Sequence, residues 1–429
     1  MQIFGASFFE SVSPWVVLYL LGGLLASIPL LIWGYLFYKK DPERKDVIIL
    51  SFSAGVMSVV PIFLVIGAMG TSPLKFGSFE LPGLNVYKML GDAVSHGGFE
   101  KLTAYIAVSI LCFFAMYIVV GLVIFLLDLI SGEQSIKSFE KILGRSVEAP
   151  LLFITLGTLI GGVAFLFDWS LEKVLYMNLL VGAVEEFAKH LVLRFSDENK
   201  FKTVADAIEF SIMVALGFSF LENIIYFVDY TWLSCDAGAI NSGVCTFNGE
   251  IGRYVRNIGS VSTMGIFLGR SIMSTLTHIV ASGIFGYFYG LANFAPDELK
   301  SYALRPKSLF TKFMAGMHRL LHVKSETLLR EEKLLEGAIA AMFFHGMYNF
   351  FVDPDTQIYF SKFFPPDSVL LRLSTIGVAL IMLICGLTYI FILLSRPQNH
   401  IVWSNKRVLE KKKKLEEVEE RLTKQLSNK

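Results

Sequence analysis

Charged and polar side chains lie inside segments of this chain that are otherwise apolar enough to span a lipid bilayer. Four neighbouring apolar segments carry them: Glu185, Glu186 and Lys189 in one, Glu222 and Asn223 in the next, then Arg270 and His278, and finally His345 and Asn349. A charge at the bilayer centre costs at least about 2.5 kcal/mol on insertion scales, so such groups are usually partnered and functional. We therefore expect one shared polar site within the membrane.

The composition assigns the chain to the membrane proteins. Its 429 residues are 54% hydrophobic and only 17% charged, and the mean hydropathy is +0.58. Too few polar side chains exist to coat soluble domains of this length. Apolar runs of about 20 residues predict an all-α polytopic fold with about nine transmembrane helices. The predicted spans are 15–38, 46–70, 102–130, 151–169, 173–194, 208–230, 260–291, 334–353 and 368–394.

The distribution of Lys and Arg predicts the orientation. The loop after the first span holds Lys39, Lys40, Arg44 and Lys45, and the segment 292–333 is also rich in Lys and Arg, whereas the loops on the opposite side are poorer in them. Because cytoplasmic loops carry the excess of basic residues, we place the N-terminus outside and the C-terminus in the cytoplasm.

Three regions follow from this arrangement. Residues 1–149 hold the first three helices, 150–353 a core with helices four to eight and the cytoplasmic amphipathic segment 292–333, and 354–429 the last helix and a charged helical tail. Within the core, 307–324 reads as a helix lying on an anionic leaflet. The basic residues follow the inner face of the membrane, so we expect no nucleic-acid partner.

The fifth span carries two adjacent carboxylates. Glu185 lies about 18 Å along the helix from the outer end of its span, near the midplane. Glu185 and Lys189 are four residues apart and share a helix face, so a neutralising ion pair is one explanation of both. That pair would leave Glu186 without a cation unless His190 or another helix supplies one. Adjacent residues differ by about 100° around a helix, so one carboxylate can face a cavity while the other supports it.

Polar pairs also occur in the sixth and eighth spans. Glu222 lies about 12 Å from the outer end of its span, and with Asn223 it could merely hydrogen-bond a neighbouring helix. His345 and Asn349 are four residues apart, so the Asn amide could fix the orientation of the imidazole. A hydrogen bond that serves only packing is the alternative for this pair.

The seventh span carries a polar stripe with a spacing of four residues: Arg270, Ser274, His278 and Ser282. Arg cannot shed its charge, so Arg270 needs a carboxylate partner, and Glu222 or Glu186 are the candidates.

Together these residue types suit hydrolysis of an amide bond. A Glu can take a proton from water, a His can stabilise the oxyanion or protonate the leaving amine, and Asn or Arg can support both. The same residues could instead hold a divalent metal such as Zn²⁺ that activates the water. Spacing leaves both options open, with Glu186, Glu222, His278 and His345 as the candidate ligands.

The ordered motifs resemble those of the PrsW-type intramembrane proteases, within the wider group of CAAX-processing and bacteriocin-processing membrane proteases. They are EExxK at 185–189, FxxxEN at 218–223, a His at 278 and HxxxN at 345–349. The resemblance covers about residues 150–353. It implies a multi-pass protease of the bacterial cytoplasmic membrane that cuts a membrane protein, such as a single-pass anti-sigma factor.

Carried over by position, the resemblance makes five residues catalytic candidates: Glu185, Glu186, Glu222, His278 and His345. Lys189, Asn223 and Asn349 become supporting residues, as does Arg270 from the stripe described above. The roles of the two adjacent glutamates are interchangeable at this level.

Two other functions use similar residues. A transporter would also bury carboxylates and His, but it favours internal repeats, and the polar groups here concentrate in spans five to eight. A non-catalytic scaffold derived from a protease is expected to lose a motif position, and all matched positions are present. A further open point concerns Cys235 and Cys245, which share one polar loop and could form a disulfide or remain free thiols.

Overall fold

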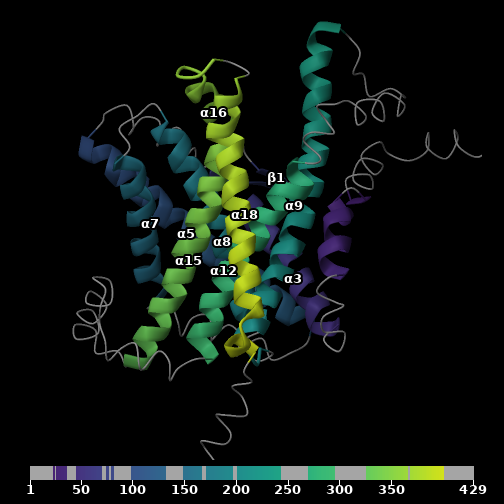
Figure 1. The fold of residues 1–429 in the computed structure, drawn as a ribbon, viewed down its shortest axis with the longest axis vertical. Coiled ribbons are helices and arrows are strands. Elements are labelled where there is room, and N and C mark those ends of the chain that lie inside the picture. The colour runs from purple at the N-terminus through teal and green to yellow at the C-terminus, as the bar shows by residue number, and fades with distance from the viewer. Residues whose placement is uncertain are drawn as a thin grey trace, which may run out of the picture.

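The computed structural model describes most of the helical part of the chain. The described residues are 23–24, 26–35, 45–69, 74–76, 79–81, 98–131, 148–166, 171–196, 201–242, 269–294, 325–365 and 368–400. The long helices run roughly alongside one another as a bundle (Figure 1). The predicted interfacial helix 307–324, the tail 405–429 and the Cys235–Cys245 pairing lie outside what is described.

The described elements are mainly helices. In chain order the α-helices are α3 (Lys45–Met69), α5 (Gly98–Ser131), α7 (Glu148–Leu166), α8 (Glu172–Ser196), α9 (Val204–Ser242), α12 (Thr275–Phe294), α15 (Ser325–Val352), α16 (Pro354–Phe360), α17 (Val369–Arg372) and α18 (Val378–Ser395). Two π-helices, η2 (Gly269–Ser274) and η3 (Leu373–Gly377), lead into α12 and α18, and a 3₁₀ turn, η4 (Pro397–His400), follows α18. Strands β1 (Leu74–Phe76) and β2 (Phe79–Leu81) form a small antiparallel hairpin that the sequence did not predict.

The apolar composition of the helices confirms a membrane protein. Four of the described helices are long and apolar enough to cross a membrane: Lys101–Leu122, Val204–Tyr226, Gly269–Asn293 and Val369–Ser395. Shorter apolar helices occupy Ala26–Tyr35, Ile48–Ile62 and Ile154–Val163. Helix α8 also lies on a predicted span, but Glu185, Glu186 and Lys189 lower its apolar character. The total of nine spans and the orientation stay predictions.

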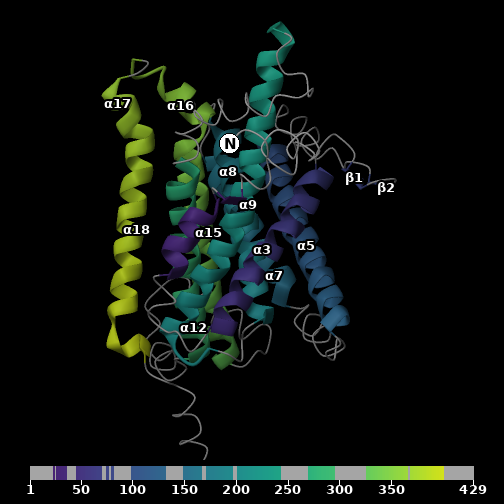
Figure 2. The ribbon, with the colours of Figure 1, turned by 90° about the vertical axis from the view of Figure 1, so that its right-hand side faces the viewer.

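The helices with the motif residues form the centre of the bundle. Helix α9 packs against α12 and α3, α8 packs against α15, and α12 packs against α15. In the apolar window of Val204–Tyr226, 83% of the residues are buried inside the protein, against 28% for Val369–Ser395. Figure 2 accordingly shows α18 at the edge of the bundle. The polar residues therefore sit on the best-enclosed helices.

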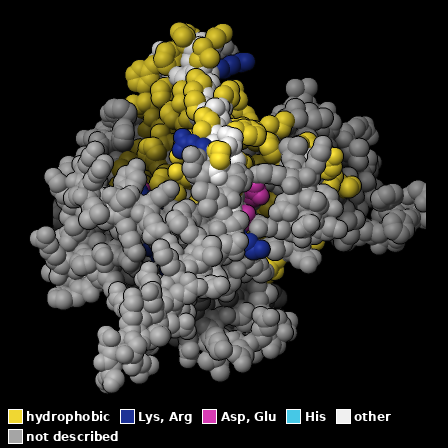
Figure 3. All heavy atoms as spheres, turned by 60° about the horizontal axis from the view of Figure 1, so that its bottom comes forward, with side chains coloured by type: hydrophobic (Ala, Val, Ile, Leu, Met, Phe, Trp, Pro, Cys, Tyr) yellow, Lys and Arg dark blue, Asp and Glu magenta, His cyan; other side chains and the backbone are white. Residues whose placement is uncertain are grey.

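The described part of the outer surface is strongly apolar. Large side chains such as Ile381, Ile384 and Phe391 on α18 are each 62% exposed. Hydrophobic side chains cover most of the described surface visible in Figure 3. Exposed apolar surface on this scale is typical of contact with lipid.

Glycines allow α8 and α15 to approach closely. A Cβ on Gly182 would lie 2.6 Å from the backbone nitrogen of Gly346, and a Cβ on Gly346 would lie 2.7 Å from Cα of Leu179. Small residues at such a crossing let helix backbones pack directly. Near one end of the pair, Asn178 donates a hydrogen bond of 2.9 Å from Nδ2 to Oδ2 of Asp353. These contacts set the depth and rotation of α15 against α8, and hence the place of His345.

Candidate functional site

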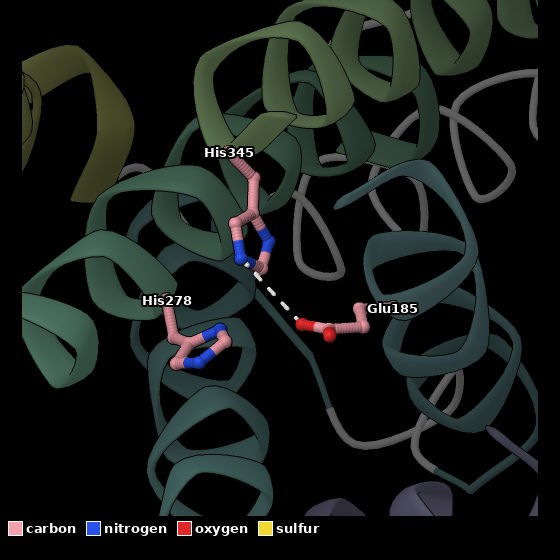
Figure 4. Close-up of side chains that lie close together, drawn as sticks. All are labelled: Glu185, His278 and His345. Atoms are coloured by element: carbon pink, nitrogen blue, oxygen red, sulfur yellow. Dashed lines mark ion pairs between the residues drawn. The ribbon is translucent and has the colours of Figure 1, made fainter. Parts of the chain in front are cut away.

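Four helices direct polar side chains to one interior region. The residues that supply its carboxylate, ammonium and imidazole groups are each no more than 7% exposed: Glu185, Glu186 and Lys189 on α8, Glu222 on α9, His278 on α12 and His345 on α15. Glu185, His278 and His345 point toward one another from three different helices (Figure 4). These helices therefore form the shared polar site expected from the sequence.

Glu186 accepts hydrogen bonds at both of its carboxylate oxygens. Its Oε1 lies 2.7 Å from Nζ of Lys189 and 2.8 Å from Nδ1 of His345, and its Oε2 accepts from Oγ of Ser282 at 3.0 Å. A carboxylate can only accept, so Nδ1 of His345 is the N–H of that ring. In the neutral imidazole this leaves the lone pair on Nε2.

Lys189 joins Glu186 to His278. Its Nζ lies 2.7 Å from Nδ1 of His278 and 4.1 Å from the centre of the Phe218 ring. The sequence had offered Glu185 as the ion-pair partner of Lys189, four residues away. The structure instead pairs Lys189 with Glu186, three residues away, which is equally close on a helix surface.

Glu222 binds two groups from the next helical segment. Its Oε2 lies 2.9 Å from Nε2 of His278, and its Oε1 accepts from Nη2 of Arg270 at 2.9 Å. Of the two carboxylates predicted as partners of Arg270, the structure selects Glu222. Arg270 lies in the π-helix η2, a type of turn that often marks functional sites. The guanidinium also lies 3.4 Å from the centre of the Tyr226 ring, one turn beyond Glu222, a neighbour that the sequence analysis did not name.

Glu185 differs from the other two carboxylates. Its Oε2 is buried and has no hydrogen-bond partner among the described residues. It lies 3.5 Å from Nε2 of His345, the nitrogen that carries the lone pair. The structure therefore separates the two adjacent glutamates, because Glu186 is fully hydrogen-bonded and Glu185 is not.

Within the described structure, neither asparagine is hydrogen-bonded to an imidazole. Asn223 donates from Nδ2 to Oγ of Ser219 and to Oγ1 of Thr275, both at 3.3 Å, and so links α9 to α12. Its Oδ1 is buried without a hydrogen-bond partner within the described part. Asn349 is half-buried, and no hydrogen bond joins it to His345 in the described structure. The sequence did not identify Ser219 or Thr275, because isolated hydroxyl residues in a span carry no distinctive pattern.

Three further polar residues from the sequence analysis, one His and two Ser, have different surroundings. His190 packs its ring edge-on against Phe285, with 4.0 Å between ring centres, and so lies beside aromatic side chains. Ser282, the last member of the polar stripe, binds Glu186, whereas Ser274 is half-buried in the last position of η2. The residues of the stripe therefore bind two different carboxylates. Ser282 binds Glu186, whereas Arg270 and His278 bind Glu222.

Comparison with known proteins identifies the segment that holds most of this site. Residues 139–311 match the PrsW family of intramembrane metalloproteases. The predicted resemblance is confirmed. The matched segment contains α7, α8, α9, η2 and α12, whereas α15 with His345 lies beyond it. No curated protein and no solved structure matches the chain.

The PrsW proteins are a family of metalloproteases, and three of the described side chains in this chain are close enough together to hold a metal. Ligand atoms of Glu185, His278 and His345 all lie within 4.8 Å of one another, so their proximity is compatible with a metal site. This set differs from the one predicted, in which Glu186 and Glu222 were the carboxylate ligands. Both ring nitrogens of His278, however, are already hydrogen-bonded, to Lys189 and Glu222. Glu185 and His345 alone fall short of the three protein ligands usual in catalytic zinc sites.

Proposed function

We propose that this chain is an intramembrane endopeptidase that hydrolyses a peptide bond of a membrane-protein substrate. The match to the PrsW family and the buried group of Glu and His side chains support this function. The proposal includes nine spans in the bacterial cytoplasmic membrane, with the N-terminus outside and the C-terminus in the cytoplasm. A single-pass anti-sigma factor is the proposed kind of substrate.

One observation carries the assignment of the base. Glu185 presents a buried carboxylate oxygen with no hydrogen-bond partner among the described residues, 3.5 Å from the lone-pair nitrogen of His345. Glu186 and Glu222 are each held by a cation and by an imidazole. A general base needs a free lone pair with which to accept a proton of the water. Glu185 has one, so we assign it the activation of water.

Side chains of this chain can carry out the proton transfers that the hydrolysis requires. Glu185 takes one proton from water, and the water oxygen forms a bond to the peptide carbonyl carbon. As the C–N bond breaks, the leaving nitrogen receives the proton from Glu185, either directly or through Nε2 of His345. Glu186 accepts the N–H at Nδ1 of His345 and so keeps the lone pair on the side of Glu185.

The remaining groups form the frame of the site. The cluster holds three carboxylates against two cations, Lys189 and Arg270, and those cations contact Glu186 and Glu222. Among the described residues, Glu185 is the carboxylate of this cluster that forms no ion pair with Lys or Arg. An enclosed, fixed arrangement of this kind strengthens electrostatic interactions with the reacting groups.

The test is a cleavage assay in reconstituted vesicles. The candidate substrates are single-pass membrane proteins with cytoplasmic domains. Glu185→Gln is expected to abolish cleavage while leaving the fold intact, and His345→Ala to lower it by at least about 100-fold. Glu336→Gln on α15 is the matched control, since Glu336 contacts Lys333 and lies outside the site. Full cleavage by both Glu185→Gln and His345→Ala would rule out the proposed site.

A further inference from the structure

The two imidazoles of the site are hydrogen-bonded differently. His345 has one nitrogen bound to Glu186, and its other nitrogen faces Glu185 at 3.5 Å. His278 has Nδ1 2.7 Å from Lys189 and Nε2 2.9 Å from Glu222. His278 therefore has no free nitrogen, although it is one of the three side chains close enough together to hold a metal.

Lys189 determines which nitrogen of His278 carries the proton. An ammonium group can donate hydrogen bonds but cannot accept them. Nδ1 of His278 must therefore be the acceptor, and Nε2 carries the hydrogen that it donates to Glu222. The Lys189 side chain is only 3% exposed, and its Nζ is also held by Glu186 and the Phe218 ring. Its position is thus fixed from three sides.

This arrangement competes with a metal. An imidazole binds a metal ion through a lone pair, and the single lone pair of His278 already accepts from Lys189. Binding through Nε2 instead would require the proton to move to Nδ1, where it would face the ammonium hydrogens of Lys189. In either case the contact between Lys189 and His278 must break before His278 can become a ligand.

We propose that Lys189 is a positioning residue that fixes His278 as the Nε2–H tautomer and thereby keeps the Glu185–His278–His345 group from binding a divalent metal. This inference rests on the proposed function only in taking that group as the active site. Its consequence is a site in which His278 serves as a hydrogen-bond donor to Glu222.

The first test measures metal binding without any substrate. The purified full-length protein, in detergent, is titrated with Co²⁺, whose visible absorption changes when protein ligands replace its water molecules. We expect Lys189→Met to bind one equivalent at least about tenfold more tightly than the wild type. Groups hydrogen-bonded to the ligands of a metal commonly alter its affinity by about 10–100-fold, and here the group removed opposes binding. Adding His345→Ala to Lys189→Met should remove the gain. Lys173→Met is the matched control, because Lys173 is exposed on the same helix.

Two results of the titration would overturn the inference. One is stoichiometric Co²⁺ binding by the wild type that His278→Ala abolishes. The other is that the wild type and Lys189→Met bind Co²⁺ with the same affinity, or that neither of them binds it.

A second measurement covers the case in which Lys189→Met fails to fold. Nitrogen-15 NMR of histidine-labelled wild type distinguishes the two neutral tautomers, and His278→Asn assigns the signal. We expect an unprotonated Nδ1 and a protonated Nε2 for His278, and the opposite tautomer contradicts the inference. Neither measurement uses cleavage. A protein that cleaves no substrate and binds no metal would therefore contradict the proposed function but not the role of Lys189.

Discussion

Nδ1 of His345 lies 2.8 Å from Oε1 of Glu186, although 159 positions separate the two residues in the sequence. This contact joins α15 to α8 in the interior of the bundle. It gives Glu186 the task of orienting the imidazole and directs Nε2 of His345 to Glu185. The two adjacent glutamates consequently have different environments and different expected responses to substitution.

Glu186→Gln is expected to destabilise the protein more than Glu185→Gln. The amide leaves Lys189 as a buried charge without its counter-charge, which costs about 3–5 kcal/mol. Glu185 makes no hydrogen bond at Oε2, so its amide should cost at most about 1 kcal/mol. Denaturant unfolding of the two variants in one detergent makes the comparison. Equal losses would show that Lys189 does not depend on Glu186.

The loss of stability caused by removing Arg270 should be partly reversed when its partner, Glu222, is neutralised. Arg270→Met leaves Glu222 with His278 as its remaining partner among the described residues, and a buried carboxylate without a cation is costly. The double variant Arg270→Met with Glu222→Gln should therefore be more stable than Arg270→Met alone. We expect an interaction free energy of about 1–3 kcal/mol in the double-mutant cycle, measured by unfolding. Additive effects would show that the ion pair contributes little.

The close crossing of α8 and α15 predicts strong sensitivity at Gly346. Gly346→Ala would place a Cβ 2.7 Å from Cα of Leu179, so the helices must separate or rotate. We expect a loss of about 1–3 kcal/mol of stability and a loss of cleavage, because His345 would move away from Glu186. Unfolding and cleavage assays check both effects.

Gly162→Ala is the matched control for that substitution. A Cβ on Gly162, in helix α7, would meet no atom within 4 Å, so this variant should keep both stability and cleavage. If Gly346→Ala behaves like Gly162→Ala, the close approach of the two backbones is not required for the site.

Chelation is expected to leave cleavage unchanged. The proposed reaction uses Glu185 and His345, and Lys189 occupies the lone pair that His278 would need as a ligand. The assay compares cleavage before and after incubation with a strong Zn²⁺ chelator and dialysis. A loss of activity that added Zn²⁺ restores would contradict this expectation and favour the metal-dependent alternative raised by the sequence.

Some of the site could be predicted because its signals are local. Arg270 cannot lose its charge, so the need for a carboxylate partner follows from its place in an apolar segment. The EExxK spacing likewise places Glu185, Glu186 and Lys189 on adjoining faces of one helix. Neither pattern selects a partner, since residues three and four positions apart are equally near on a helix. Tyr226 was within reach of such reasoning, as it lies four residues after Glu222.

By itself, the sequence determined that this is a helical membrane protein and that its buried polar residues come from neighbouring helices, because hydropathy and helical spacing depend only on nearby residues. The tertiary structure alone decided that Lys189 pairs with Glu186 and Arg270 with Glu222. It also decided that the described hydrogen bond of His345 goes to Glu186 and not to Asn349. Those choices depend on the depth and rotation of one helix against the next. Backbone contacts such as Gly182 with Gly346 set both, and they join residues far apart in the chain.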